Sequence, residues 1–209
     1  MVNEGLLLID SGGQYFGATT DITRTISIGI PTSQQKEYYT KVLKGHIALG
    51  GAIFPKNRTT GAHLDVLARQ YLWQDRVDYA HGTGHGVGSF LSVHEGPQNI
   101  SLAGFGTKLQ PGMVVSNEPG YYVSGKFGIR IENMMYVKSL DDQGSQNFLT
   151  FEMLTLVPYA KELIDTNALS QVEIEFLRSY YQKIKQKVLP LLSGKAKTWC
   201  EWHIDNYIS

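Results

Sequence analysis

The glycine-rich stretch AHGTGHGVG, residues 80–88, places two histidines, His81 and His85, four positions apart. Such a stretch could bind a metal ion, hold a phosphate or simply turn the chain. The phosphate and dinucleotide alternatives are weak, because no Walker-type lysine follows and the third glycine comes one residue late. Ser89 also lies outside a nucleophile-elbow pattern. Metal binding and a plain turn are the two interpretations left open by this stretch alone.

Four acidic residues stand at the ends of, or inside, segments with the pattern of strands. Asp10 ends an apolar run and Asp21 lies in the β-like segment that follows, so a hairpin could bring both carboxylates to one face. Glu118 follows a short apolar run, and Glu132 lies within IRIENMMYV. The alternatives are solvated or turn-capping acids and, for Glu132, an ion pair with Arg130 two positions away.

Together, the four carboxylates and the imidazole of His85 form a hard, oxygen-rich set of donors. The glycines that flank His85, Gly84 and Gly86, would let its ring approach a crowded centre. Such a set suits one or two divalent ions of the manganese, cobalt or zinc kind. Two ions could lower the pKa of a shared water and polarise a carbonyl, which is the chemistry of metal-assisted hydrolysis.

The elements that must position these residues follow from periodicity, capping boxes and turn residues. The pattern predicts short strands over 5–28 with a turn at 11–13, helices over 34–53, 62–74 and 170–189, a strand-rich region over 77–137, a polar turn at 141–147 and a strand over 148–158. Tyr180 and Tyr181 of the last helix are expected to be packing residues.

Charge and cysteine content narrow the class of protein. The chain has 209 residues, 42% of them hydrophobic, with 19 basic and 19 acidic residues, so a broad basic surface for nucleic acid or anionic membrane is not expected. The apolar run Leu6–Ile9 is too short for a signal segment or a membrane span. The single cysteine, Cys200, fits a reducing compartment, and we expect a cytoplasmic protein.

Five ordered motifs give a family resemblance over about residues 5–160: LLIDSGGQYFGATTDITRT, HGTGHGVG, SVHEGP, SNEPGYY and GIRIENMMYV. Together they resemble the pita-bread metallopeptidases and, within them, the aminopeptidase P family. The resemblance implies an α+β pita-bread fold, a curved and mostly antiparallel sheet flanked by helices. It also implies a catalytic domain over 1–160 and a helical C-terminal extension over 161–209, whose helix could serve a homodimer.

The metal ligands are likewise implied by the resemblance. Asp10 would be a bidentate ligand of one ion, Asp21 and Glu132 would bridge two ions, and His85 and Glu118 would complete the coordination. The cofactors would be two divalent metal ions, manganese first, with zinc and cobalt as alternatives.

The catalytic assignments come from the same resemblance. His81 and His94 would contact the substrate and stabilise the tetrahedral intermediate, Arg130 would hydrogen-bond near the centre, and Glu118 would shuttle a proton. The expected reaction is attack by a metal-bridging hydroxide on the N-terminal Xaa-Pro bond of a small peptide.

Three alternatives remain at this point: a prolidase that cuts Xaa-Pro dipeptides, a methionine aminopeptidase, and a binding module that has lost activity. The C-terminal extension argues against the first two, and the five ligand positions argue against the third. The chain enters a buried-looking strand almost at Met1, which suggests the start of a fragment. We therefore expect full turnover to need a longer natural protein.

Overall fold

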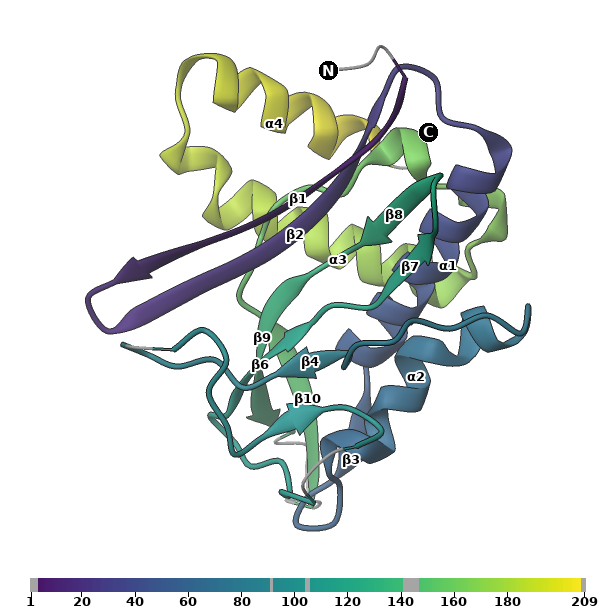
Figure 1. Cartoon of the computed structure of the whole chain (residues 1–209). Helices are drawn as coiled ribbons and strands as arrows, with labels where there is room; N and C mark the ends of the chain where they lie inside the picture. The colour runs from purple at the N-terminus through teal and green to yellow at the C-terminus, as the bar shows by residue number, and fades with distance from the viewer. Residues whose placement is uncertain (1–3, 91, 104–105, 141–146, 208–209) are drawn as a thin grey trace.

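The structure, a computed structural model, describes residues 4–90, 92–103, 106–140 and 147–207 (Figure 1). The strands are β1 Gly5–Tyr15, β2 Ala18–Ile28, β3 Ile53–Pro55, β4 Gly84–His85, β5 Asn99–Ile100, β6 Val114–Asn117, β7 Gly120–Val123, β8 Phe127–Arg130, β9 Asn133–Ser139 and β10 Phe148–Met153. The helices are α1 Ser33–Gly50, α2 Gly61–Trp73, α3 Gln171–Lys187 and α4 Gly194–Asn206, with short 3₁₀ helices at Lys161–Leu163, Thr166–Ala168 and Leu189–Leu191. The polar turn expected at 141–147 lies, except for Asn147, outside the described residues.

The strands form one four-stranded sheet and three two-stranded ribbons. The sheet has the order β3-β10-β9-β6, and the ribbons are β1-β2, β4-β5 and β7-β8. Every strand pairing within the described residues is antiparallel. The α+β class with a mostly antiparallel sheet, expected from the sequence, is confirmed.

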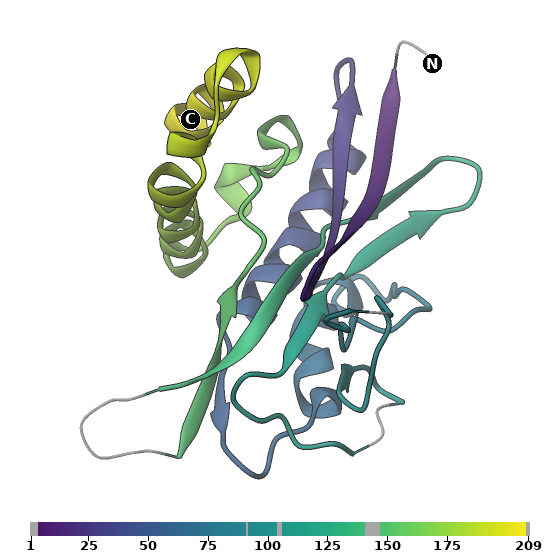
Figure 2. The same cartoon turned by 90° about the vertical axis from the view of Figure 1, so that its left-hand side faces the viewer.

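Helices α1 and α2 pack against each other, and α1 also contacts strands β6, β7, β8 and β10. Figure 2 shows α1 running behind the strands, with α3 and α4 set to one side of the sheet. The interface is apolar, because α1 contributes the fully buried Tyr39 and Leu43, α2 contributes Leu72, and the sheet contributes Val115 and Met135. This packing holds the strands in place, so that the loops between them are supported by a rigid core.

The expected helices over 34–53, 62–74 and 170–189 are confirmed with small shifts at their ends. The capping box at the start of α1 is formed, since Thr32 Oγ1 accepts from the backbone of Gln35 at 3.2 Å and the Gln35 side chain accepts from Thr32 N at 2.8 Å. Ser170 and Glu173 cap α3 in the same way. Helix α4 lies in the C-terminal extension that was expected to be helical, although no separate helix was predicted there, and its Ile204 side chain is buried.

The turn expected at 11–13 is wrong. Strand β1 continues through Gly12 and Gly13 to Tyr15, and the chain reverses at Phe16 and Gly17 instead. Gly12 pairs with Asp21, and a Cβ at Gly12 would lie 2.7 Å from the carbonyl oxygen of Thr20. Glycine is thus present for close approach of two strands rather than for a turn.

Helices α1 and α2 meet at Gly45, and we expect Gly45→Ala to destabilise the fold. A Cβ at this position would lie 2.1 Å from the backbone oxygen of Ala68 in α2, so the helices would have to separate. Overpacking of this kind costs about 1–3 kcal/mol, whereas alanine in a free helix would stabilise by about 1 kcal/mol. Urea unfolding measures whether the free energy of unfolding falls or rises in Gly45→Ala. Gln34→Ala at the exposed start of α1 is the control, and an unchanged or higher free energy of unfolding for Gly45→Ala would contradict the prediction.

No helix within the described residues is long and apolar enough to cross a membrane.

Candidate metal centre

The β1-β2 hairpin presents three polar side chains on one face. Asp10 pairs with Thr23 across the ribbon, and Asp21 pairs with Gly12. Because residues two apart in a strand share a face, Asp10, Asp21 and Thr23 all point the same way. The expected placement of the two aspartates on one face of a hairpin is confirmed, although the register is set by a turn farther along the chain.

The glycine-rich segment lies directly against β6. The backbone nitrogen of His85 donates to Ser116 Oγ at 3.0 Å, and Ser116 Oγ donates to Glu118 Oε1 at 3.1 Å. A Cβ at Gly84 would lie 2.0 Å from the carbonyl oxygen of Ser116, so a side chain there would push the segment away. Gly84 therefore lets His85 come beside Glu118.

A buried ion pair on α2 holds the other end of this segment. Asp65, fully buried, accepts from Arg69 Nε at 2.6 Å and from the hydroxyl of Thr83. Arg69 also donates to the backbone oxygen of His81 at 2.7 Å. The carbonyl oxygen of Thr83 accepts from the backbone nitrogen of Glu118 at 2.7 Å. Helix α2 thus fixes the loop that carries both histidines.

Glu132 lies between β8 and β9, not inside a continuous strand as expected. Its backbone nitrogen donates to the carbonyl oxygen of Thr23 at 3.0 Å, and the Thr23 hydroxyl donates to Glu132 Oε2 at 2.6 Å. The alternative of an ion pair with Arg130 is not realised. Arg130 instead donates to Asp10 Oδ2 at 2.7 Å and to the Thr23 hydroxyl at 3.1 Å.

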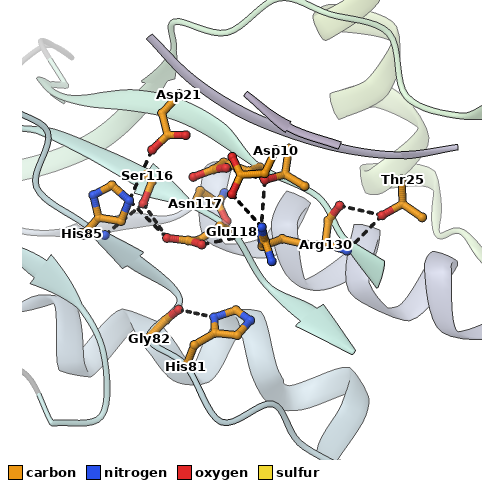
Figure 3. Close-up of polar contacts among 12 residues, drawn as sticks. Asp10, Asp21, Thr25, His81, Gly82, His85, Ser116, Asn117, Glu118 and Arg130 are labelled. Atoms are coloured by element: carbon orange, nitrogen blue, oxygen red, sulfur yellow. Dashed lines mark hydrogen bonds and ion pairs between the residues drawn. The ribbon is translucent and has the colours of Figure 1, made fainter. Parts of the chain in front are cut away.

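These elements bring four of the five expected ligands together. Asp21, His85 and Glu132 each offer an atom within 4.8 Å of the others. Figure 3 shows His85 between two carboxylates: its Nε2 lies 3.4 Å from Asp21 Oδ2 and 3.3 Å from Glu118 Oε1. Asp10 is farther out, with its side chain 49% exposed and turned to Arg130.

The pKa values show how strongly these groups interact. Burial, followed by the charges of Glu118 and Asp21, raises the pKa of Glu132 to about 8 against the opposing hydrogen bond from Thr23. Burial also raises the pKa of Glu118. Burial alone would lower the pKa of His85, but the hydrogen bond to Asp21 and the charge of Glu118 raise it to about 8. Carboxylates held this close repel one another when no cation lies between them.

The donor set fits divalent metal ions. Carboxylate oxygens and one imidazole suit manganese, cobalt or zinc. A cation between them would offset the burial and the carboxylate repulsion that together raise the pKa values of Glu118 and Glu132. The hydrogen bonds from Ser116 and Thr23 hold these two carboxylates from behind, as supporting contacts to metal ligands do.

The two other histidines expected in the site, His81 and His94, both contact residues of the site. The ring of the exposed His94 lies against that of His85, with ring centroids 3.9 Å apart and ring planes tilted by 45°. His81 Nδ1 donates to the carbonyl oxygen of Gly82 at 2.7 Å, and its Nε2 faces the hydroxyl of Tyr122 at 2.8 Å. Burial lowers the pKa of His81, which favours the neutral ring that this arrangement requires.

Tyr122 is a residue of the site that sequence reasoning did not single out. Its hydroxyl accepts from Arg130 at 3.0 Å and joins the arginine to His81. The motif SNEPGYY contained it, but only the pairing of β7 with β8 places it beside Arg130.

Two hollows adjoin the cluster. A polar cleft of 330 Å³ is lined by residues that include Asp10, Asp21 and His94, so the site is open to solvent on this side. A more apolar groove of 460 Å³ lies along β2 beside Asp21 and is bordered by Val87, Met134 and the segment 154–157. A small molecule can therefore reach the carboxylates.

Sequence and structure comparisons connect this arrangement to known proteins. Metallopeptidase family M24 matches residues 1–139, and the C-terminal region of peptidase_M24 matches residues 147–205. Xaa-Pro aminopeptidase 1 of Dictyostelium discoideum is 51% identical over 192 residues, which are 90% of this chain and 30% of that protein. Aminopeptidase P1 of Lotus japonicus is 48% identical over 94% of this chain and 30% of its own length. The chain thus spans about a third of these relatives.

Solved structures agree. An X-prolyl aminopeptidase from Caenorhabditis elegans, described as a cytosolic enzyme with a di-nuclear active site, superposes with a TM-score of 0.89 at 40% identity and covers 97% of this chain and 33% of its own. The prolidase of Pyrococcus furiosus gives a TM-score of 0.60 at 34% identity over 72% of this chain and 41% of its own. The pita-bread fold implied by the motifs is confirmed, and the chain belongs to metallopeptidase family M24.

Proposed function

We propose that this chain carries the catalytic centre of a metal-dependent aminopeptidase that hydrolyses the N-terminal Xaa-Pro bond of peptides. The observation that carries the proposal is the convergence of Asp21, His85 and Glu132, with ligand atoms within 4.8 Å of one another. The match of the C-terminal region to residues 147–205 and the relatives named Xaa-Pro aminopeptidase support it over a prolidase.

Two divalent ions, manganese first, would be held by Asp10, Asp21, His85, Glu118 and Glu132. When bound, such ions supply Lewis acidity that activates water and polarises a carbonyl. Glu118, which accepts a hydrogen bond from the Ser116 hydroxyl, would also shuttle a proton.

The surrounding residues would orient the peptide. His94 lines the polar cleft, while the ring of His81 is held in place by Tyr122 and Gly82, so that these two side chains would border the bound peptide. Arg130 orients both Asp10 and Tyr122. The free amino group of a peptide would be attracted to the acidic side of the cleft, which favours cleavage of the first residue.

Residues 1–160 would form the catalytic unit and residues 161–209 the extension. The substrates would be small peptides with proline in second position, and a homodimer through the extension is part of the proposal. The nematode enzyme is described as cytosolic, and we expect a cytoplasmic location here too.

A peptide-length comparison tests the function. With Mn²⁺ added, we expect release of the first residue from an Xaa-Pro-Xaa tripeptide to be at least about tenfold faster than hydrolysis of an Xaa-Pro dipeptide or an Xaa-Ala-Xaa tripeptide, since a missing contact in the transition state lowers kcat/KM by such factors. Faster cleavage of the dipeptide would support a prolidase instead. No cleavage of any of the three, by this chain or by a longer protein that contains it, would refute the proposal.

A further inference from the structure

Behind the metal centre lies a buried arginine without a carboxylate partner among the described residues. Arg24 of β2 is 8% exposed, and its guanidinium donates to main-chain oxygens, an amide oxygen and a phenol. Nη1 donates to the carbonyl oxygens of Thr23 at 2.9 Å and Glu132 at 2.7 Å. A buried cation is costly unless its donors are all satisfied, and these contacts satisfy them.

The contacts of Arg24 Nη1 lie at the point where β2 meets the start of β9. Here Glu132 N donates to the Thr23 carbonyl oxygen, and the Thr23 hydroxyl donates to the Glu132 carboxylate. The guanidinium therefore binds the backbone of Thr23 and of Glu132, whose side chains are hydrogen-bonded to each other. A displacement of Arg24 would move a candidate metal ligand and the hydroxyl that orients it.

The other side of Arg24 faces the C-terminal region. Its Nη2 lies 2.8 Å from Asn133 Oδ1, 2.8 Å from the Val157 carbonyl oxygen and 3.3 Å from the hydroxyl of Tyr180 in α3. The Tyr180 hydroxyl also accepts from the backbone nitrogen of Val157 at 3.0 Å and can donate to the carbonyl oxygen of Thr155 at 3.1 Å. This phenol, 3% exposed, ties the segment after β10 to the arginine.

We propose that Tyr180 and Arg24 are positioning residues of the metal centre, through which helix α3 of the C-terminal region fixes the backbone and carboxylate of Glu132. The inference rests on the proposed function, because it takes Glu132 as a metal ligand. It assigns the C-terminal region a role in metal binding besides packing. Tyr180 is accordingly more than the packing residue that the sequence suggested.

Helix α3 offers a matched control. Tyr181 is 1% exposed, and its hydroxyl bonds the backbone of Tyr159, accepting from the nitrogen at 3.1 Å. No hydrogen bond joins it to Arg24 within the described residues. Tyr180→Phe and Tyr181→Phe each remove one buried phenolic oxygen from the same helix, but only the first removes a contact to the arginine.

The test is a titration of both variants and the unaltered protein with Co²⁺. Calorimetry measures the affinity, and visible absorption reports on the coordination of the bound Co²⁺. We expect Tyr180→Phe to weaken Co²⁺ binding about tenfold and to change the absorption spectrum, since loss of a partner that supports a ligand lowers metal affinity by such factors. Tyr181→Phe should stay within about twofold of the unaltered protein. Arg24→Lys should weaken binding further, and if it fails to fold, the tyrosine pair still decides.

Three outcomes would overturn the inference. Equal Co²⁺ affinity and spectra in the two tyrosine variants would reduce Tyr180 to a packing residue while leaving the metal site in place. Weaker binding in Tyr181→Phe than in Tyr180→Phe would also refute the relay. Absence of Co²⁺ binding by the unaltered protein would refute the proposed metal site itself, and the inference with it.

Discussion

Asp21→Asn is expected to remove at least one equivalent of bound metal and to lower peptide hydrolysis about 10³-fold or more. The substitution keeps the shape of the side chain but replaces the carboxylate, whose Oδ2 lies 3.4 Å from His85 Nε2, with an amide. An amide coordinates metal ions poorly. Metal analysis of the purified variant and the rate on an Xaa-Pro-Xaa tripeptide measure the two effects.

The same variant carries an internal check on folding. The charge of Asp21 contributes to the raised pKa values of Glu118 and Glu132, so neutralising it relieves repulsion in the metal-free protein. The substitution also removes the hydrogen bond through which Asp21 raises the pKa of His85. We therefore expect the free energy of urea unfolding without metal to change little, while added Mn²⁺ stabilises the variant less than the unaltered protein. Asp205→Asn on the exposed face of α4 is the control. Unchanged metal stoichiometry in Asp21→Asn would refute Asp21 as a ligand.

Acid is expected to destabilise the fold through His46, which is fully buried. Burial, and next the charge of Arg24, lower the pKa of His46 to about 3. Its Nδ1 donates to the Asn117 carbonyl oxygen at 3.1 Å, and its Nε2 accepts from the Tyr159 hydroxyl at 3.2 Å, so the neutral ring is the one that fits.

The direction of the pH effect follows from the two pKa values. In the unfolded chain His46 binds a proton near pH 6.5, but in the folded protein only near pH 3. The unfolded state therefore binds more protons between these values, and the free energy of unfolding falls as the pH falls through this window. The slope approaches about 1.4 kcal/mol per pH unit, which amounts to about 3 kcal/mol between pH 7 and pH 4.

Urea unfolding at intervals from pH 7 to pH 4, on the unaltered protein and on His46→Gln, measures this contribution. The glutamine variant starts less stable but should have the shallower profile, because it lacks one titrating group. The site carboxylates are common to both proteins, so their contribution cancels in the difference. Parallel profiles would show that His46 is protonated in the folded state or accessible to solvent.

Several features were predictable from the sequence because their causes are local. The capping boxes Thr32/Gln35 and Ser170/Glu173 mark where α1 and α3 begin, since the hydrogen bonds that start a helix involve residues three apart. Helical periodicity gave the buried face of α1. The ordered motifs gave the family, because five motifs at compatible spacings are specific together although none of them is specific alone.

The hairpin shows where local reasoning failed. Two consecutive glycines suggested a turn, but Gly12 and Gly13 pair with β2 as part of β1. Glycine is needed at position 12 because the neighbouring strand leaves no room for a Cβ. That distance depends on the partner strand, which periodicity does not specify. The ion pair assigned to Arg130 failed for a similar reason, since Asp10 lies closer once the hairpin crosses β8.

The sequence by itself determined the donor types, the family and the helices, because these depend on residue identity and on neighbours within four positions. Only the tertiary structure decided which donors meet, because Asp21, His85, Glu118 and Glu132 come from segments far apart in the chain. Long-range contacts of β2 with β9 and of β4 with β6, together with the pairing of β6 with β9, bring them together. The stretch AHGTGHGVG illustrates both limits. Its glycines indicated that the backbone packs closely against a neighbouring segment. The contact of Gly84 with Ser116 and the hydrogen bond from Arg69 to the His81 carbonyl oxygen, however, exist only in the folded chain.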